Sequence, residues 1–91
     1  MATIYRTNGE TQSVTPKNRK YFQLKELQRI VGGYVENIYL NDGTIMVINE
    51  EGKRENLSLN IEATSIFRKN FPASNGFVIG DVLITERAYL K

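Results

Sequence analysis

The spacing of hydrophobic and polar residues changes several times along the chain and predicts alternating strands and helices. The first segment, "TIYRTNGETQSV", has two short β-prone runs around Asn8-Gly9, a pair that favours the type I′ turns of β-hairpins. Pro16 ends the second run, and the polar, basic stretch "PKNRK" follows as a loop. We therefore expect residues 1–20 to form an N-terminal hairpin and a basic loop.

The segment from Phe22 to Gly32 changes to a helical period. Its apolar positions lie on one helical face; they are Leu24, Leu27, Ile30 and Val31. Gln23 stands at the N-cap, where Ser, Thr, Asp or Asn is usual. Gly32 suits the left-handed residue that ends many helices.

Residues 34–49 predict a second hairpin, with strands over 34–40 and 44–49. A two-residue Asp42-Gly43 turn pairs Leu40 with Ile45, whereas a type I turn with a bulge at Gly43 pairs Leu40 with Thr44. The pattern leaves both registers open. Because both strands carry apolar residues on both faces, we expect both to be central in a sheet that is covered on each side.

The remaining residues predict a second helix and a final strand. After a turn at Glu50-Glu51-Gly52, the short charged segment "KREN" is an optional strand. Asn60 or Ser58 can cap a helix over 61–70, which Phe71-Pro72 terminates.

The final strand, "FVIGDVLIT", carries a bulge or bend at Gly80-Asp81. The resulting order, β-β-α-β-β-(β)-α-β, predicts an α+β fold. We expect a mostly antiparallel sheet of about five to six short strands with two helices packed against it.

Length and composition indicate one globular domain over residues 1–91, because chains divide into several domains only at greater length. The hydrophobic content is 41% and the charged content 24%, so disorder is not expected. Since a domain of this size buries little core, association with a second copy would stabilise it, and we expect a homodimer. The start, "MATIYRTNGE", has neither a basic nor an apolar signal region, which predicts a cytoplasmic protein without a membrane span.

The chain contains no cysteine and no histidine. This excludes disulfides, thiolate nucleophiles, Cys/His zinc sites and histidine acid–base catalysis. Neither a G-x-G-x-x-G motif nor a P-loop occurs, so no cofactor is predicted. Serine hydroxyls have no histidine base and no Ser-x-x-Lys pattern is present. We expect a protein that is not an enzyme.

The charges are distributed unevenly and indicate a first candidate surface. Six basic and two acidic side chains give residues 1–33 a net charge of +4, and two basic and six acidic give residues 34–66 a net charge of −4. The basic candidates are Lys17, Arg19, Lys20, Lys25 and Arg29. Lys25 and Arg29 are four residues apart and share a helical face.

Three interpretations of this basic set are open: a solvated polar face, a surface for an acidic protein partner, and a nucleic-acid surface. The interleaved Tyr21 and Phe22 suit base stacking beside phosphate contacts. The net charge of +2 falls well short of a typical nucleic-acid-binding domain.

A second candidate site surrounds the acidic turn. Its members are Asn49, Glu51, Gly52 and Asn60. They are either ligand contacts or structural residues, with the glycine ending an element and the asparagines bonding to backbone. The acidic spacing fits no EF-hand, so no metal site is predicted.

Several short motifs together carry a family resemblance. They are "IVGGY" at 30–34, "NEEGK" at 49–53, Asn60 before the second helix, and "IGDVLI" at 79–84. Their order over residues 21–85 resembles the family called domain of unknown function 3846. The chain departs from that pattern at Gln23, where Ser or Thr is common, and the N-terminal residues do not match it. The resemblance implies carriage by phages, plasmids and conjugative elements, and it supplies no activity.

From these observations we predict a small, non-enzymatic binding protein of a phage or mobile element that acts by binding a host protein. The basic set is its predicted partner surface. Two alternatives stay open: a protein that binds or sequesters a nucleotide-like small molecule at Asn49, Glu51, Gly52 and Asn60, and a nucleic-acid-binding regulator.

Overall fold

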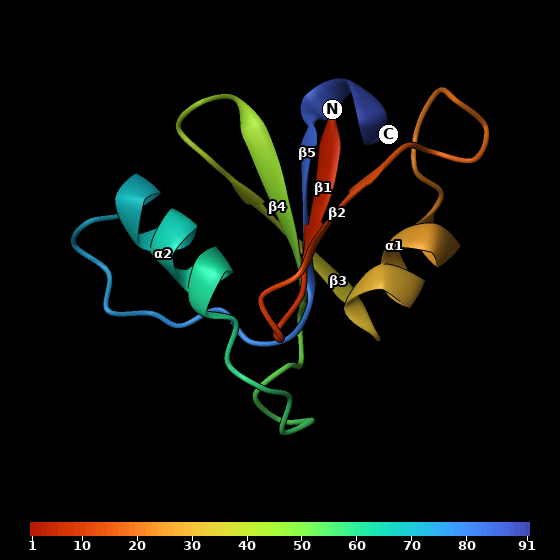
Figure 1. Cartoon of the computed structure of the whole chain (residues 1–91). Coiled ribbons are helices and arrows are strands. Elements are labelled where there is room, and N and C mark those ends of the chain that lie inside the picture. Colours follow the sequence, from red (N-terminus) through yellow and green to blue (C-terminus); the bar gives the residue numbers. More distant parts are fainter.

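A computed structural model describes all of residues 1–91. The chain forms five strands and two helices in the order β-β-α-β-β-α-β (Figure 1). The strands are β1 (Ala2–Tyr5), β2 (Thr11–Val14), β3 (Val35–Tyr39), β4 (Thr44–Asn49) and β5 (Val82–Glu86). The helices are α1 (Leu24–Val31) and α2 (Ile61–Asn70), and a 3-10 turn covers Arg87–Tyr89. The order confirms the α+β prediction. The optional strand in "KREN" does not form, because residues 50–56 are turns.

All five strands form one antiparallel sheet in the order β2-β1-β5-β4-β3. The first and last strands are therefore neighbours, and β1 holds the N-terminal hairpin within the sheet. The expectation that both strands of the second hairpin are central is right for β4 and wrong for β3, which is an edge strand. Several side chains of β3 are exposed. The apolar residues of this strand therefore do not indicate burial on both faces of the sheet.

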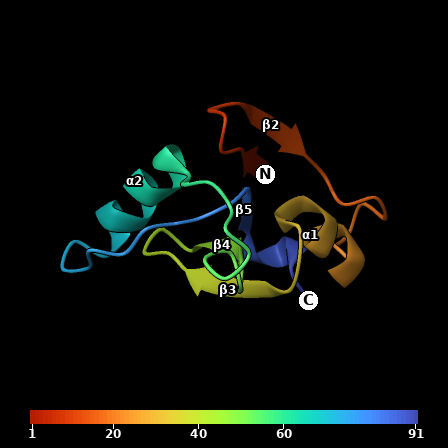
Figure 2. The ribbon, with the colours of Figure 1, turned by 90° about the horizontal axis from the view of Figure 1, so that it is seen from below.

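The side chains of the sheet alternate between two hydrophobic layers, and Figure 2 shows α1 and α2 on opposite sides of the strands. The layer beneath α1 contains Ala2, Ile4, Phe22, Leu27, Val31, Ile45, Val47 and Leu83. The layer beneath α2 contains Leu40, Met46, Ala63, Val78 and Val82. Because consecutive residues of β4 and β5 enter different layers, both strands read as continuous apolar runs.

Helix α1 differs from its prediction at the first turn. Leu24 is 57% exposed, although its spacing places it with the apolar face. Phe22 fills that part of the core instead; it is buried, it contacts the Tyr89 ring edge-on, and its N–H donates to the Tyr89 carbonyl over 2.8 Å. The predicted end is confirmed, since Gly32 has a φ of 85° and its N–H donates to the Gln28 carbonyl.

The register of the second hairpin is the bulged one. The Leu40 N–H donates to the Thr44 carbonyl over 2.9 Å, and the Gly43 N–H donates to the Leu40 carbonyl over 3.2 Å. Gly43 has a φ of 89°, as the bulge requires. The Asp42 carboxylate accepts from the Thr44 N–H and hydroxyl, which favours this turn over the two-residue alternative.

The first hairpin has the same turn, so the expectation of a type I′ turn at Asn8-Gly9 is wrong. Gly9 has a positive φ of 92°, whereas Asn8 does not, and a type I′ turn requires both. The Arg6 N–H donates to the Glu10 carbonyl. The Asn8 side chain accepts from the Glu10 N–H over 2.9 Å, and this local bond stabilises the bulged form.

Candidate functional site

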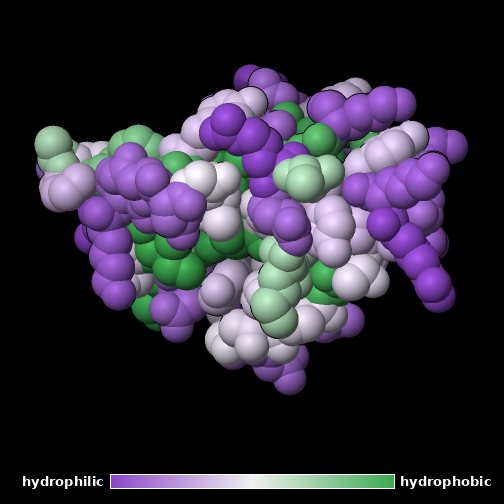
Figure 3. All heavy atoms as spheres, turned by 90° about the horizontal axis from the view of Figure 1, so that it is seen from above, coloured by the Kyte–Doolittle hydropathy of each residue, from purple (hydrophilic) through white to green (hydrophobic).

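The five predicted basic residues lie on one side of the molecule. Lys17, Arg19 and Lys20 are in the loop between β2 and α1, and Lys25 and Arg29 are on the outer surface of α1; all are exposed. The loop is held to the helix because Glu26 accepts from the N–H of Lys17 and from that of Gln23. Figure 3 shows hydrophilic side chains over this side of the molecule. We call these five residues the basic face.

None of the five side chains has an intramolecular partner. No ion pair or side-chain hydrogen bond involves them, whereas most other cations are engaged. Arg6 and Arg54 pair with carboxylates, and Arg68, Arg87 and Lys91 lie over aromatic rings. Of the 12 lysines and arginines, the unengaged ones outside the basic face are Lys53 and Lys69. The unengaged positive charge is therefore concentrated at α1 and its loop.

The backbone of the loop holds Arg19 in an unusual conformation. Arg19 has a φ of 64°, a left-handed conformation that costs a residue with a Cβ about 1–2 kcal/mol. The Arg19 N–H donates to the Pro16 carbonyl, and the Asn18 side chain accepts from two backbone N–H groups that follow. Glycine or asparagine would suit this backbone better, so the requirements of the loop do not explain an arginine here.

A shallow depression of about 590 Å³ lies where α1 ends. It brings part of the basic face next to the acidic turn, because Lys25 and Arg29 line it together with Glu51 and Glu55. Its remaining lining residues are Gln28, Gly32, Gly33 and Tyr34. No ion pair crosses it, because Glu51 pairs with Arg54 and Glu55 accepts from the Asn49 amide, whereas Lys25 and Arg29 are unengaged.

Asn49 of the second candidate set is buried and serves the fold. Its amide nitrogen donates to the Val31 carbonyl over 3.1 Å and to the Glu55 carboxylate over 2.9 Å. Its oxygen accepts from the Glu51 N–H over 2.7 Å. Asn49 therefore fastens the end of α1 and the acidic turn to β4, and none of its polar atoms is free for a ligand.

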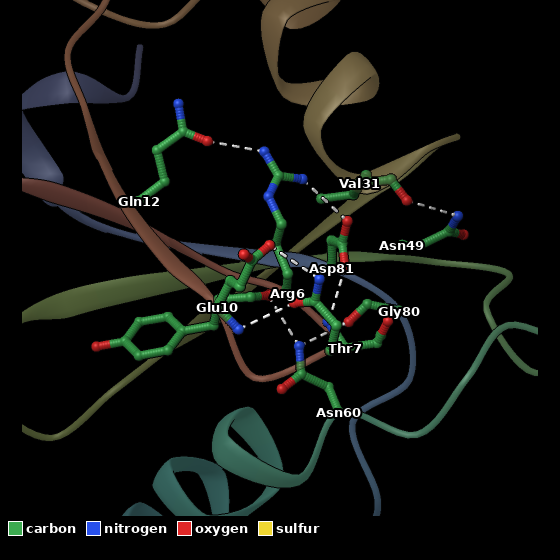
Figure 4. A network of polar contacts seen from close by, with 11 residues as sticks. Arg6, Thr7, Glu10, Gln12, Val31, Asn49, Asn60, Gly80 and Asp81 are labelled. Atoms are coloured by element: carbon green, nitrogen blue, oxygen red, sulfur yellow. Dashed lines mark hydrogen bonds and ion pairs between the residues drawn. The ribbon is translucent and has the colours of Figure 1, made fainter.

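Asn60 is fully buried and joins three segments. Its oxygen caps α2 by accepting from the Ala63 N–H over 3.0 Å, which confirms the predicted cap. Its amide nitrogen donates to the carbonyls of Tyr5 and Gly80, each over 2.9 Å. Figure 4 shows this amide between the first hairpin and the chain leading into β5. Both polar atoms of its side chain are therefore engaged within the fold.

The other two members of that set are also engaged by neighbouring residues. Glu51 pairs with Arg54 over 2.9 Å. Gly52 is buried, and a Cβ built on it would lie 3.2 Å from the Ile79 carbonyl oxygen. Glycine therefore allows the two chain segments to approach closely there. Of this set, only the Glu51 side chain faces a depression together with the basic face.

Asp81 has a larger role than the bulge residue that the sequence indicated. Its carboxylate accepts from the Thr7 N–H over 2.9 Å and from Arg6 over 3.2 Å, and Arg6 also donates to Gln12. Figure 4 shows these contacts joining the first hairpin turn to the start of β5. Because the partners are more than 70 residues apart in the chain, no local pattern could have indicated the contact.

The acidic side chains do not converge on a metal-binding cluster, since no three of them lie together. Neither helix combines the length and apolar character needed to cross a membrane. In this small α+β domain the unengaged cations are thus grouped on the basic face, whereas the amides of Asn49 and Asn60 are engaged within the fold.

The chain belongs to the family described as Domain of unknown function (DUF3846), whose model matches residues 2–89. This confirms the resemblance seen in the motifs and extends it, because the N-terminal hairpin is part of the match. Comparison with curated proteins and with solved structures finds no match.

Proposed function

We propose that the protein is a non-enzymatic, cytoplasmic binding protein of a phage or other mobile element, and that its basic face binds an acidic surface of a host protein. The observation that carries the proposal is the concentration of unengaged cations at α1 and its loop. Exposed charges of one sign raise the association rate and the specificity for a partner of opposite charge. The resemblance to proteins of mobile elements supplies the expectation that the partner belongs to the host.

Three features favour a protein partner over the alternatives. The depression beside α1 offers carboxylates of Glu51 and Glu55 as well as cations, a mixture that suits a polar protein surface and repels phosphate groups. The amides predicted for a small-molecule site are engaged within the fold. The net charge of +2 is also low for a nucleic-acid-binding domain.

A matched pair of charge reversals tests the proposal. The immobilised protein and its Lys25→Glu/Arg29→Glu variant are incubated with nuclease-treated host lysate, and captured proteins are quantified by mass spectrometry. The control is Lys53→Glu/Lys69→Glu, which makes the same change of charge at exposed, unengaged lysines elsewhere. We expect an acidic protein to be captured by the wild type and the control and to be lost from the first variant.

Added salt should weaken that capture, because exposed charge pairs are screened. Equal capture by both variants would overturn the assignment of the surface. Capture from untreated lysate that is absent from nuclease-treated lysate would replace it with the nucleic-acid alternative.

A further inference from the structure

Strand β3 leaves one edge of the sheet without a partner strand. The register with β4 engages alternate residues, as the bonds from the Leu40 N–H to Thr44 and from the Glu50 N–H to Tyr34 show at either end. The N–H and C=O groups of the intervening residues, Val35, Asn37 and Tyr39, therefore point away from the sheet. They form a regular row of free donors and acceptors.

This edge has few of the features that usually prevent strands from pairing, and Glu36 is its one charged residue. Natural edge strands are protected by proline, lysine, a bulge or a covering segment. Strand β3 contains no proline, lysine or arginine, and its bulge lies beyond it at Gly43. Exposed aromatic rings stand at both ends, with Tyr34 66% and Tyr39 58% exposed.

The opposite edge of the sheet, β2, is less suited to pairing. It is one residue shorter, and the buried Pro16 follows it closely. By its register with β1, only Thr11 and Ser13 point their backbone groups outward. Figure 2 shows the two edges at opposite ends of the sheet.

We propose that β3 is a self-association surface, at which two copies of the chain pair their β3 strands antiparallel about a two-fold axis at Asn37. This register places Asn37 opposite Asn37 of the second copy, and Val35 opposite Tyr39. All the outward backbone groups then bond across the axis. Each Val35–Tyr39 contact is a β-branched residue against an aromatic one, which is a favourable cross-strand pair.

The one charged side chain of the edge does not lie directly opposite a like charge in this pairing. Glu36 is the single charged residue of β3, and the same register sets it opposite Ile38 rather than opposite its own copy. The Tyr39 ring is already held by Arg87, whose guanidinium lies 5.4 Å from the ring centroid. The self-complementary register points to a second copy as the occupant of this edge, because one sequence supplies both halves of each pair.

The pairing has a geometric consequence for the basic face. A two-fold axis at an antiparallel edge contact runs perpendicular to the sheet, so both α1 helices lie on the same side of the continuous sheet. Two basic faces would then act together on a partner. This consequence rests on the proposed function, whereas the dimer does not.

Proline substitutions test the edge directly. In Asn37→Pro the lost N–H points outward, so the bonds between β3 and β4 are kept while the bonds to the second copy are removed. The control, Ser13→Pro, makes the same change on the β2 edge. By sedimentation and native mass spectrometry we expect a dimer for the wild type and Ser13→Pro, and a monomer for Asn37→Pro. A monomeric wild type overturns the proposal, as does a dimer that persists in Asn37→Pro.

A single cysteine tests the register even if the proline variant fails to fold. The chain contains no cysteine, and opposite residues in a bonded antiparallel pair lie about 5.5 Å apart between Cα atoms, which a disulfide can bridge. Asn37→Cys should form a covalent dimer on mild oxidation, and Ser13→Cys should not. Equal cross-linking of the two variants would overturn the register. Since no host partner is needed, failure of this test is distinct from failure of the proposed function.

Discussion

The buried asparagines and the basic face are both polar, yet the fold uses them in opposite ways. Every polar side-chain atom of Asn49 and Asn60 bonds within the molecule. No side chain of the basic face does so, although five cations lie there together. A buried polar group must be satisfied internally, whereas an exposed cation without a partner contributes little to stability. The comparison separates residues that maintain the fold from residues that are available to bind.

The largest expected loss of stability is at Asn60, one of the two buried asparagines. In Asn60→Ala the cap of α2 is lost and the carbonyls of Tyr5 and Gly80 lose their donor, which should lower the free energy of unfolding by about 4 kcal/mol. Asn60→Ser keeps an oxygen for the cap and should recover about 1 kcal/mol of this loss. Denaturant unfolding measures both. A change below about 1 kcal/mol in Asn60→Ala would contradict the structural role.

A smaller loss is expected at Asn49. Asn49→Ala leaves the Val31 carbonyl and the Glu51 N–H without their bonds, at a cost of about 2 kcal/mol. Because Asn49 holds the acidic turn, hydrogen exchange should accelerate in residues 50–56 more than in α2. Uniform acceleration throughout the chain would show that the asparagine does not act on this turn. Capture of the host partner should be unchanged once the folded fraction is corrected for.

A substitution in the basic face should instead raise stability and weaken partner binding. Arg19→Gly relieves the left-handed conformation and should raise the free energy of unfolding by about 1 kcal/mol. It also removes one cation from the proposed partner surface, so partner capture should fall while stability rises. Thermal unfolding and the capture assay on the same preparation measure the two effects. A variant that gains stability and captures the partner as well as the wild type would show that Arg19 is not part of the partner-binding surface.

The smallest effect concerns Asp42, an exposed acid that its own turn engages. The hydrogen bond from the Thr44 hydroxyl, assisted by the Thr44 N–H, lowers the pKa of Asp42 below its ordinary value. The ionised Asp42 carboxylate therefore stabilises the folded protein fully above its unfolded-state pKa, and this stabilisation is lost as the pH falls through the lower folded-state pKa. In Asp42→Asn the dependence of stability on pH should become shallower in this acidic range, as measured by thermal unfolding between neutral and strongly acidic pH. An unchanged pH dependence would show that the turn does not hold the ionised form.

Local patterns were sufficient at the helix ends, where local interactions decide, but they indicated the wrong turn type at Asn8-Gly9, where a local bond from the Glu10 N–H to the Asn8 side chain favours the bulged turn. Helix α2 begins and ends where the cap at Asn60 and the Phe71-Pro72 terminator indicated, and α1 ends at Gly32 as its position suggested. The bulged register at Gly43 was one of two local solutions. The side chain of Asp42 favours that solution through bonds only two residues away.

Two other errors arose where segments distant in the chain decide which side chains are buried and which strands are neighbours. Phe22 occupies the core position that the helical period assigned to Leu24, because the C-terminal turn at Tyr89 packs against it. The pattern of β3 matched that of a central strand, but the sheet adds β5 on the far side of β4 and leaves β3 at the edge. The order of strands in the sheet depends on how the hydrophobic faces of all the elements pack together. The spacing of hydrophobic residues within one strand does not indicate that order.

The sequence by itself determined the α+β class, the helix ends, the family and the residues of the basic face, because these depend on side-chain chemistry and neighbours close in the chain. Only the tertiary structure decided that β1 pairs with β5, that Asn49 and Asn60 are engaged within the fold, and that β3 carries a free edge. The physical reason is that satisfying a buried amide or leaving an edge unpaired depends on segments far apart in the chain, which meet only when the hydrophobic layers form.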